Sequence, residues 1–430
     1  MINFEKKVLD NGLRVILAPM NNTDAVTFLV LVKTGSRRET KNVNGISHFL
    51  EHMFFKSTKN RPGLGEVFRD LNKIGAAHNA FTSKETTGFW VKSSAKDADT
   101  SIDIISDILT APLFKSEEME KERNVIMQEI DMYEDNPSQK IQDVLENVTF
   151  GDQPMGWDIA GSKKTIKDIE REDLIKYEKN NYLAKNMVVA VAGNIDKGGI
   201  LKKIGGAFSR IRKGGVKPFK KVKVQQKSPQ VRIIKKDSDQ THVAMAVRSH
   251  DMFDEKRYVL NLLSIILGGN SSSRLFVEIR EKLGLAYYVY SWSDHYSDSG
   301  YLGMAAGIPH QKLPEVARKI VYICRSIKEK AIPKNDLIFA KGFLRGQMAL
   351  KFESSDEIAQ FVAGREIFYN EIIQPSDILR SIEKLNQDDI LKIAQEIFRP
   401  ERMNMAVIGR QKNDKKTQEF YSNLFKSMSK

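Results

Sequence analysis

The chain has 430 residues, of which 41% are hydrophobic, 68 are Lys or Arg and 55 are Asp or Glu. This length favours two or three domains, and the apolar share excludes a wholly disordered protein. No apolar run is long enough for a transmembrane helix, and because the first residues contain no apolar segment before a strand-like pattern, we expect no signal peptide. The single cysteine, Cys324, excludes a disulfide framework and a thiolate metal cluster. We therefore expect a cytoplasmic protein that does not associate with membranes.

The first half of the chain mixes strand-like and helix-like segments. Asn11-Gly12 stands between two apolar runs, which is typical of a tight β-hairpin, and a β-rich run at 27–32 predicts the next strand. Two further strands are expected at 78–81 and 86–91. The helix-like segments cover 45–56, 65–74, 97–109, 116–132, 140–148 and 171–177. Strands that come early and helices that come later predict an α+β fold.

Two segments of the chain resemble each other at an offset of 216 residues. Residues 182–193 and 398–409 both open on an aromatic residue, share Met, Ala and Val positions, and end an apolar strand in Gly. A single long repeat predicts duplicated domains, because each copy is large enough for its own core. We expect an N-terminal domain at 1–213, a linker at 214–228 and a homologous C-terminal domain at 229–430. Each domain should be a largely antiparallel sheet with helices packed on it.

The positive charge of the chain is concentrated around this linker. The segment 197–236 holds 14 Lys or Arg and no Asp or Glu, and without it the chain has 54 basic and 55 acidic residues. Such a patch suits an acidic partner such as nucleic acid or anionic lipid. A solvated linker between domains is the favoured interpretation, because no nucleic-acid-binding motif accompanies the patch. We expect no nucleic-acid partner.

The most specific motif is His48-Phe49-Leu50-Glu51-His52, within a helix-like segment. Two histidines four residues apart project from one face of a helix, and two neutral imidazoles placed in this way can bind one Zn²⁺. Glu51 lies on nearly the same face, where it can act as a base on water rather than as a ligand. Phe49, Leu50 and Met53 indicate that much of this helix is buried. Burying the polar groups without a ligand would leave them unpaired.

A catalytic zinc requires a third protein ligand from elsewhere in the chain. Glu122 and Glu129 lie seven residues apart in one helix-like segment, so the two carboxylates share a face. Taken alone, Glu122 is more simply explained as a solvated charge. Glu129 stands next to the apolar Ile126 and Ile130, which favours a buried role.

With these motifs, the sequence resembles the pitrilysin, insulin-degrading enzyme and mitochondrial processing peptidase superfamily of inverted-motif zinc peptidases, and within it the short-chain bacterial branch. The family pattern is Gly, nine residues, then G-x-[STA]-H-x-x-E-H, which here runs from Gly35 to Gly45 and on to His52. The resemblance implies that Glu129, which follows His52 after 76 intervening residues, is the third zinc ligand. It also implies that Glu122 supports the ligands. The segment Asn79-Ala80-Phe81 matches the family's edge strand, to which substrate adds as a further strand.

The second half carries one more match to this family and lacks a metal motif. Arg280 and Tyr287 have the seven-residue spacing of a family pair that contacts substrate and stabilises the developing oxyanion. Shifting the metal motif by 216 residues leads to Ser264, Leu267 and Gly268, which cannot bind zinc. We therefore expect one Zn²⁺ per chain.

The sequence as a whole predicts a zinc-dependent endopeptidase that cleaves extended peptides or presequence-like segments inside a closed cleft. The resemblance further implies a homodimer in which Arg280 and Tyr287 complete the partner chain's site. The alternative is a non-catalytic or partner-dependent subunit of a hetero-oligomeric peptidase or assembly complex. That alternative is disfavoured because such subunits typically lack zinc ligands, and this chain retains His48, His52 and Glu129.

Overall fold

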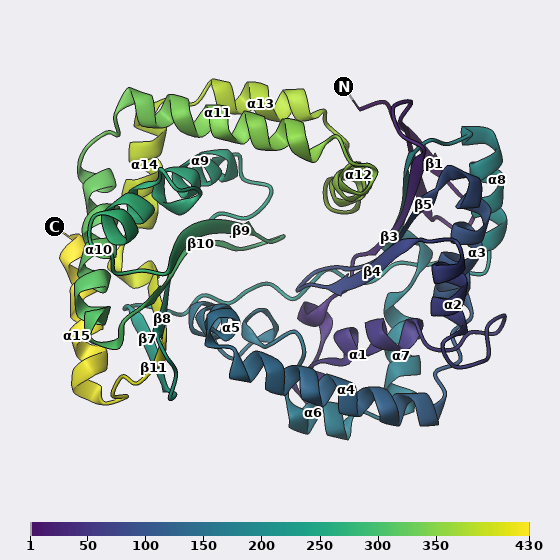
Figure 1. The fold of residues 1–430 in the computed structure, drawn as a ribbon, viewed down its shortest axis with the longest axis horizontal. Coiled ribbons are helices and arrows are strands. Elements are labelled where there is room, and N and C mark those ends of the chain that lie inside the picture. The colour runs from purple at the N-terminus through teal and green to yellow at the C-terminus, as the bar shows by residue number, and fades with distance from the viewer. Residues whose placement is uncertain (1, 430) are drawn as a thin grey trace. The chain divides into compact units, whose positions relative to one another are not determined.

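The structure, a computed structural model, describes residues 2–429, and these form two compact units (Figure 1). Unit 1 contains residues 2–130, 158–220 and 348–377, and unit 2 contains residues 131–157, 221–347 and 378–429. Both units combine a sheet with packed helices, so the predicted α+β class is confirmed. A search of the helices within residues 2–429 finds none whose length and hydropathy suit a membrane span.

Unit 1 is built on a six-stranded sheet with the order β1-β2-β6-β3-β5-β4. The strands are β1 Glu5–Val8, β2 Arg14–Pro19, β3 Ala25–Val32, β4 Ala77–Thr82, β5 Thr87–Ser94 and β6 Met187–Gly193. All pairs are antiparallel except β2 with β6. The Asn11-Gly12 hairpin is present between β1 and β2, with Gly12 at φ 91°, a value that favours glycine. Strand β4 lies at an edge, which leaves one side of its backbone free to pair.

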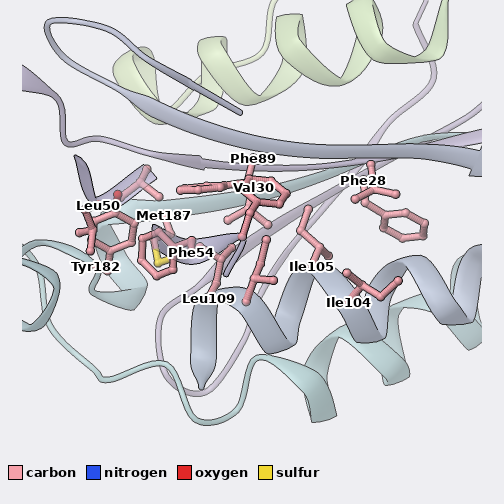
Figure 2. Close-up of a cluster of buried hydrophobic side chains, with 14 of the residues drawn as sticks. Phe28, Val30, Leu50, Phe54, Phe89, Ile104, Ile105, Leu109, Tyr182 and Met187 are labelled. Carbon is pink, nitrogen blue, oxygen red and sulfur yellow. The ribbon is translucent and has the colours of Figure 1, made fainter. Parts of the chain in front are cut away.

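Helices cover both faces of this sheet (Figure 1). The helices of unit 1 from the first half of the chain begin with α1 Ile46–Phe54, α2 Glu66–Lys73, α3 Ala98–Thr110 and α4 Ser116–Asp135, and continue with α6 Lys163–Asp168, α7 Arg171–Asn181 and α8 Lys197–Ala207. The end of α4, from Asp131 on, belongs to unit 2. Figure 2 shows Phe28, Val30 and Phe89 of the sheet directed at Ile104 and its neighbours on α3. On the opposite face lies α12 Ser355–Tyr369, a helix from the second half of the sequence.

Helix α12 is held on the unit 1 sheet by apolar and polar contacts. Its buried residues Ala359, Val362 and Ala363 belong to one cluster with residues of β2, β3 and β6. At its start the hydroxyls of Ser355 and Thr27 lie 2.8 Å apart, within hydrogen-bonding distance. This packing makes α12 part of unit 1, although it is far away in sequence.

Unit 2 repeats the sheet of unit 1. Its strands are β7 Gln230–Lys235, β8 Thr241–Ser249, β9 Tyr288–His295, β10 Gly300–Ile308 and β11 Met403–Gly409. Their order, β7-β11-β8-β10-β9, matches β2-β6-β3-β5-β4 strand for strand. The repeated segments found in the sequence become β6 and β11, which occupy equivalent positions. The helices from this half of the chain are α9 Lys256–Gly268, α10 Leu313–Glu329, α11 Lys334–Lys351, α13 Pro375–Glu383, α14 Gln387–Ile397 and α15 Lys415–Lys426.

The two halves of the chain exchange one helix each. Helix α5 Pro137–Phe150 comes from the first half, but its Ile141 and Val144 pack on the unit 2 sheet, as α12 packs on the unit 1 sheet. The chain passes from unit 1 to unit 2 at residues 220–221, inside the expected linker 214–228. The contiguous domains expected at 1–213 and 229–430 leave out this exchange, because an apolar helix face does not reveal which sheet it will cover.

Candidate metal centre

Helix α1 presents three polar side chains because its remaining residues are needed for the core. Six of its nine residues are buried, namely Ile46, Ser47, Phe49, Leu50, Met53 and Phe54. Phe54 is fully buried and its ring centroid lies 5.0–5.5 Å from those of Phe89, Phe114 and Tyr182. This anchoring orients the helix, so that His48, Glu51 and His52 remain only partly buried on its other side.

His48, His52 and Glu129 form a three-residue group that suits a metal ion. The two Nε2 atoms lie 3.2 Å apart, and the Glu129 carboxylate oxygens lie 3.7 Å from Nε2 of His48 and 3.5 Å from Nε2 of His52. Tetrahedral zinc with bonds of about 2.0–2.1 Å places neighbouring ligand atoms ~3.3 Å apart. Two imidazoles and a carboxylate are also a known donor set for catalytic zinc. The residues therefore fit the ion, and within residues 2–429 they are the one group of at least three potential ligands so arranged.

Two neighbours fix the orientation of His52. Glu122 Oε1 lies 2.8 Å from Nδ1 of His52, and Lys56 Nζ lies 2.6 Å from Oε2 of Glu122. Although burial opposes it, these contacts with His52 and Lys56 lower the pKa of Glu122. The ionised carboxylate holds the proton of His52 on Nδ1, which leaves the Nε2 lone pair for a metal. The structure thus brings Glu122, which the resemblance implied as a support for the ligands, into contact with His52.

The electrostatics of His48 and Glu51 suit a ligand and a base. Burial lowers the pKa of His48 to about 3, with a further contribution from His52, so its imidazole is neutral and able to ligate. Burial also raises the pKa of Glu51, an effect opposed by the hydrogen bond that Thr82 Oγ1 donates to its carboxylate. A glutamate with a raised pKa is better matched to proton transfer near neutral pH.

The predicted substrate strand is β4, and it lies beside this helix. Asn79, Ala80 and Phe81 are within it, and Thr82 at its end holds Glu51. Asn79 Oδ1 accepts the Ala80 backbone N–H at 2.9 Å, and the Phe81 ring lies against Gly88 on β5. Thr82 and Lys56 carried no motif of their own in the sequence, and only their place in the fold identifies them.

The equivalent position in unit 2 is closed by packing. Helix α9 occupies the place of α1, with Ser264 and Gly268 where His48 and His52 stand. A Cβ on Gly268 would lie 2.6 Å from the backbone nitrogen of Ser291 on β9. Ser291 also donates its hydroxyl to the Ser264 carbonyl at 2.6 Å. Helix and edge strand therefore touch where unit 1 holds its three potential ligands.

The predicted substrate pair lies in unit 2. Arg280 belongs to a π-helical segment, Phe276–Glu281, and its guanidinium lies 4.9 Å from the ring centroid of Phe276. Tyr287 precedes β9, is 76% exposed, and donates its backbone N–H to Gly307. The metal-binding group lies in unit 1, so the structure does not bring these residues together within one unit.

The chain belongs to peptidase family M16, the insulinase family. Residues 14–163 match the family domain described as insulinase, and residues 168–342 match the domain described as the peptidase M16 inactive domain. His48, His52 and Glu129 all lie within the first matched range, and the described residues of unit 2 contain no comparable group, which agrees with the description of the second domain. The predicted membership of the insulin-degrading enzyme superfamily is thereby confirmed.

Relatives of similar length are named as zinc proteases. The chain is 33% identical to an uncharacterized zinc protease of Rickettsia felis, over 92% of this chain and 95% of that one. It is 32% identical to the uncharacterized zinc protease YmxG of Bacillus subtilis, over 90% and 94% of the two chains. Among solved structures, a protease from Helicobacter pylori has the same fold, with a TM-score of 0.89 and 24% identity over 95% of this chain and 100% of that one. A chain of complex III2 from Candida albicans matches with a TM-score of 0.84 and 15% identity over 98% and 100%.

Proposed function

We propose that this protein is a cytoplasmic zinc endopeptidase that cleaves extended peptides or presequence-like segments, with one Zn²⁺ per chain. The observation that carries this proposal is the placement of Glu51 beside the group of His48, His52 and Glu129 on buried helical supports. The names of the relatives point in the same direction. The single cysteine, Cys324, is buried, which is compatible with a reducing compartment.

In the proposed reaction, the residues of unit 1 have separate roles. A bound zinc supplies Lewis-acid chemistry, which polarises a peptide carbonyl and lowers the pKa of water to about 7. Glu51 accepts the proton of the attacking water and later delivers it to the leaving amine. Thr82 holds the Glu51 carboxylate in place, and Glu122 fixes the tautomer of His52. The free edge of β4 at Asn79, Ala80 and Phe81 pairs with the substrate backbone, once the Asn79 side chain releases the Ala80 N–H.

Mass spectrometry of a mixed pool of unstructured peptides tests the proposed activity. The zinc-loaded protein is expected to cut peptides within their sequences, and the protein stripped by a chelator is expected to be inactive. Re-adding stoichiometric zinc should restore the same cuts, because His48, His52 and Glu129 bind the ion reversibly. Cuts that persist after complete zinc removal would contradict the proposal. The proposal would also be contradicted if the zinc-loaded protein cut no peptide, either alone or mixed with a sister chain.

We further propose a homodimer in which Arg280 and Tyr287 serve the partner chain's site and stabilise the developing oxyanion. Mixing Glu51→Gln chains with Tyr287→Phe chains is expected to recover about a quarter of wild-type activity. Half of the dimers would be mixed, and each mixed dimer would hold one complete site of two. Peptide cleavage before and after exchange of subunits measures this. Activity that stays at the level of the two parents would contradict completion in trans.

A non-catalytic or partner-dependent subunit is the second candidate. It is favoured by the description of the second domain as inactive and by the similar fold of a complex III2 chain. The retained ligands and Glu51 argue against it, since a chain without catalytic function has no need of that set. Cleavage that appears only after a sister chain is added would favour this candidate.

A further inference from the structure

The zinc helix α1 is capped by a side chain from outside the helix. Its N-cap residue, Gly45, has φ 98° and offers no side chain to satisfy the first backbone N–H groups. Glu39 does so instead, because its carboxylate accepts the N–H groups of Gly45 at 2.8 Å and Ser47 at 2.9 Å. The Asn44 amide donates to it at 2.8 Å. Glu39 is buried, and burial raises its pKa to about 7, an effect that the hydrogen bonds from Asn44, Gly45 and Ser47 oppose.

Glu39 stands at the end of a turn that also contacts the β4–β5 connection. Gly35 to Glu39 form this turn, which includes one short 3₁₀ helix. Ser36 donates its N–H to Ser83 at 3.1 Å, and Arg37 donates its N–H to Lys84 at 2.8 Å. A Cβ on Gly35 would lie 2.2 Å from the Ser83 carbonyl oxygen, so the approach requires glycine. The turn therefore joins the zinc helix to the strand whose last residue, Thr82, holds Glu51.

The basic linker is attached to this same turn. The ring of Phe219 lies 5.3 Å from the guanidinium of Arg37 and 4.2 Å from that of Arg38. Arg37 also donates to the Lys220 carbonyl and Arg38 to the Lys217 carbonyl, each at 2.7 Å. Arg37 is itself buried and paired with the buried Glu85. The linker residues 217–220 are the last residues of unit 1 before the chain enters unit 2.

We propose that the linker segment 217–220 regulates the metal centre, and that Glu39 is the positioning residue through which it acts. Contact of Phe219 with Arg37 and Arg38 holds the turn in place. The turn positions Glu39 at the start of α1, where it accepts the N–H group of Ser47. His48 is the next residue after Ser47, so the position of the first ligand depends on this contact. Release of the linker frees the turn, and the start of α1, next to the first ligand His48, loses the buried carboxyl group that accepts its N–H groups. The inference rests on the proposed zinc site, and it gives the linker a role that needs no acidic partner.

Zinc affinity of the full-length chain, measured by competition with a chromophoric chelator, tests the inference. Glu39→Gln is expected to weaken zinc binding about 10-fold to 100-fold, as for other residues that orient ligands. Phe219→Ala is expected to weaken it less, by about 3-fold to 10-fold, because the hydrogen bonds to the linker carbonyls remain. The d–d spectrum of bound Co²⁺ should change in both variants, since the ligand geometry changes with the helix start.

Matched controls separate this effect from a general loss of stability. Glu66→Gln removes a carboxylate that accepts a backbone N–H beside α2, a helix without metal ligands. Val224→Ala removes an exposed apolar side chain from the same linker. Both controls should bind Zn²⁺ and Co²⁺ as the wild type does, and thermal unfolding of all variants reports overall stability.

The double variant Glu39→Gln/Phe219→Ala decides whether the two residues act through one path. Its zinc affinity is expected to equal that of Glu39→Gln alone, because Phe219 acts through Glu39. Independent, additive losses would overturn the inference, and so would an unchanged affinity and Co²⁺ spectrum in Phe219→Ala. A wild type that binds zinc but cleaves no peptide would overturn the proposed function and leave this coupling intact.

Discussion

Glu51→Gln is expected to reduce kcat/KM for peptide cleavage by about 10²–10⁴-fold, the usual contribution of a general base. Glutamine has the same shape as glutamate and still accepts the hydrogen bond of Thr82, so the local packing is retained. It cannot take a proton from water or pass one to the leaving amine. Zinc content should equal that of the wild type, because Glu51 is not among the three ligands.

The measurement compares initial rates on one cleavable peptide with zinc content determined on the same samples. Glu120→Gln is the matched control, since Glu120 lies on the surface of α4 and pairs with Arg123. It should retain full activity. A zinc-loaded Glu51→Gln protein with near wild-type rates would contradict the role of Glu51 and place the base elsewhere.

Local sequence patterns were sufficient for the elements that are stabilised locally. The Asn-Gly pair predicted the hairpin between β1 and β2 because a tight turn depends on few residues. The repeated apolar segments predicted the strands β6 and β11, because both strands are buried on two faces and are therefore continuously apolar. The exchange of α5 and α12 could not be predicted in the same way. Each has an apolar face, and only packing over long sequence distances decides which sheet it covers.

The same distinction applies to the site. His48, Glu51 and His52 lie on one helix, so their spacing alone predicted a metal motif. Glu129 required the family resemblance, because no periodic pattern links α4 to α1. Glu39 was not found at all, since its function depends on a turn that folds back onto the helix start.

The basic linker shows how composition can mislead about structure. Its many lysines and the pair Gly214-Gly215 predicted a solvated connection, and the charged side chains of 214–228 are indeed exposed. The segment 217–220 is nevertheless attached to unit 1 through backbone carbonyls and one aromatic ring. Composition does not reveal which backbone carbonyls accept hydrogen bonds, so the attachment to the buried Arg37 and the partly buried Arg38 could not be predicted from it.

Glu129→Gln is expected to weaken zinc binding by at least about 100-fold and to abolish peptide cleavage at stoichiometric zinc. The substitution leaves a neutral amide oxygen where the group of two histidines and a carboxylate requires an anion. Glu122→Gln should have a smaller effect, about 10-fold to 100-fold, because it disturbs the hydrogen bond to His52 rather than a ligand.

Titration with zinc distinguishes the two positions. Excess zinc should restore most of the activity of Glu122→Gln, since all three ligands remain and only their orientation is less well fixed. It should not restore the activity of Glu129→Gln, because a weakly held ion with two protein ligands is easily displaced. Glu120→Gln, on the same helix, should bind zinc as the wild type does. If Glu129→Gln retained wild-type zinc affinity, Glu129 would not be a ligand. The third ligand would then have to be another residue.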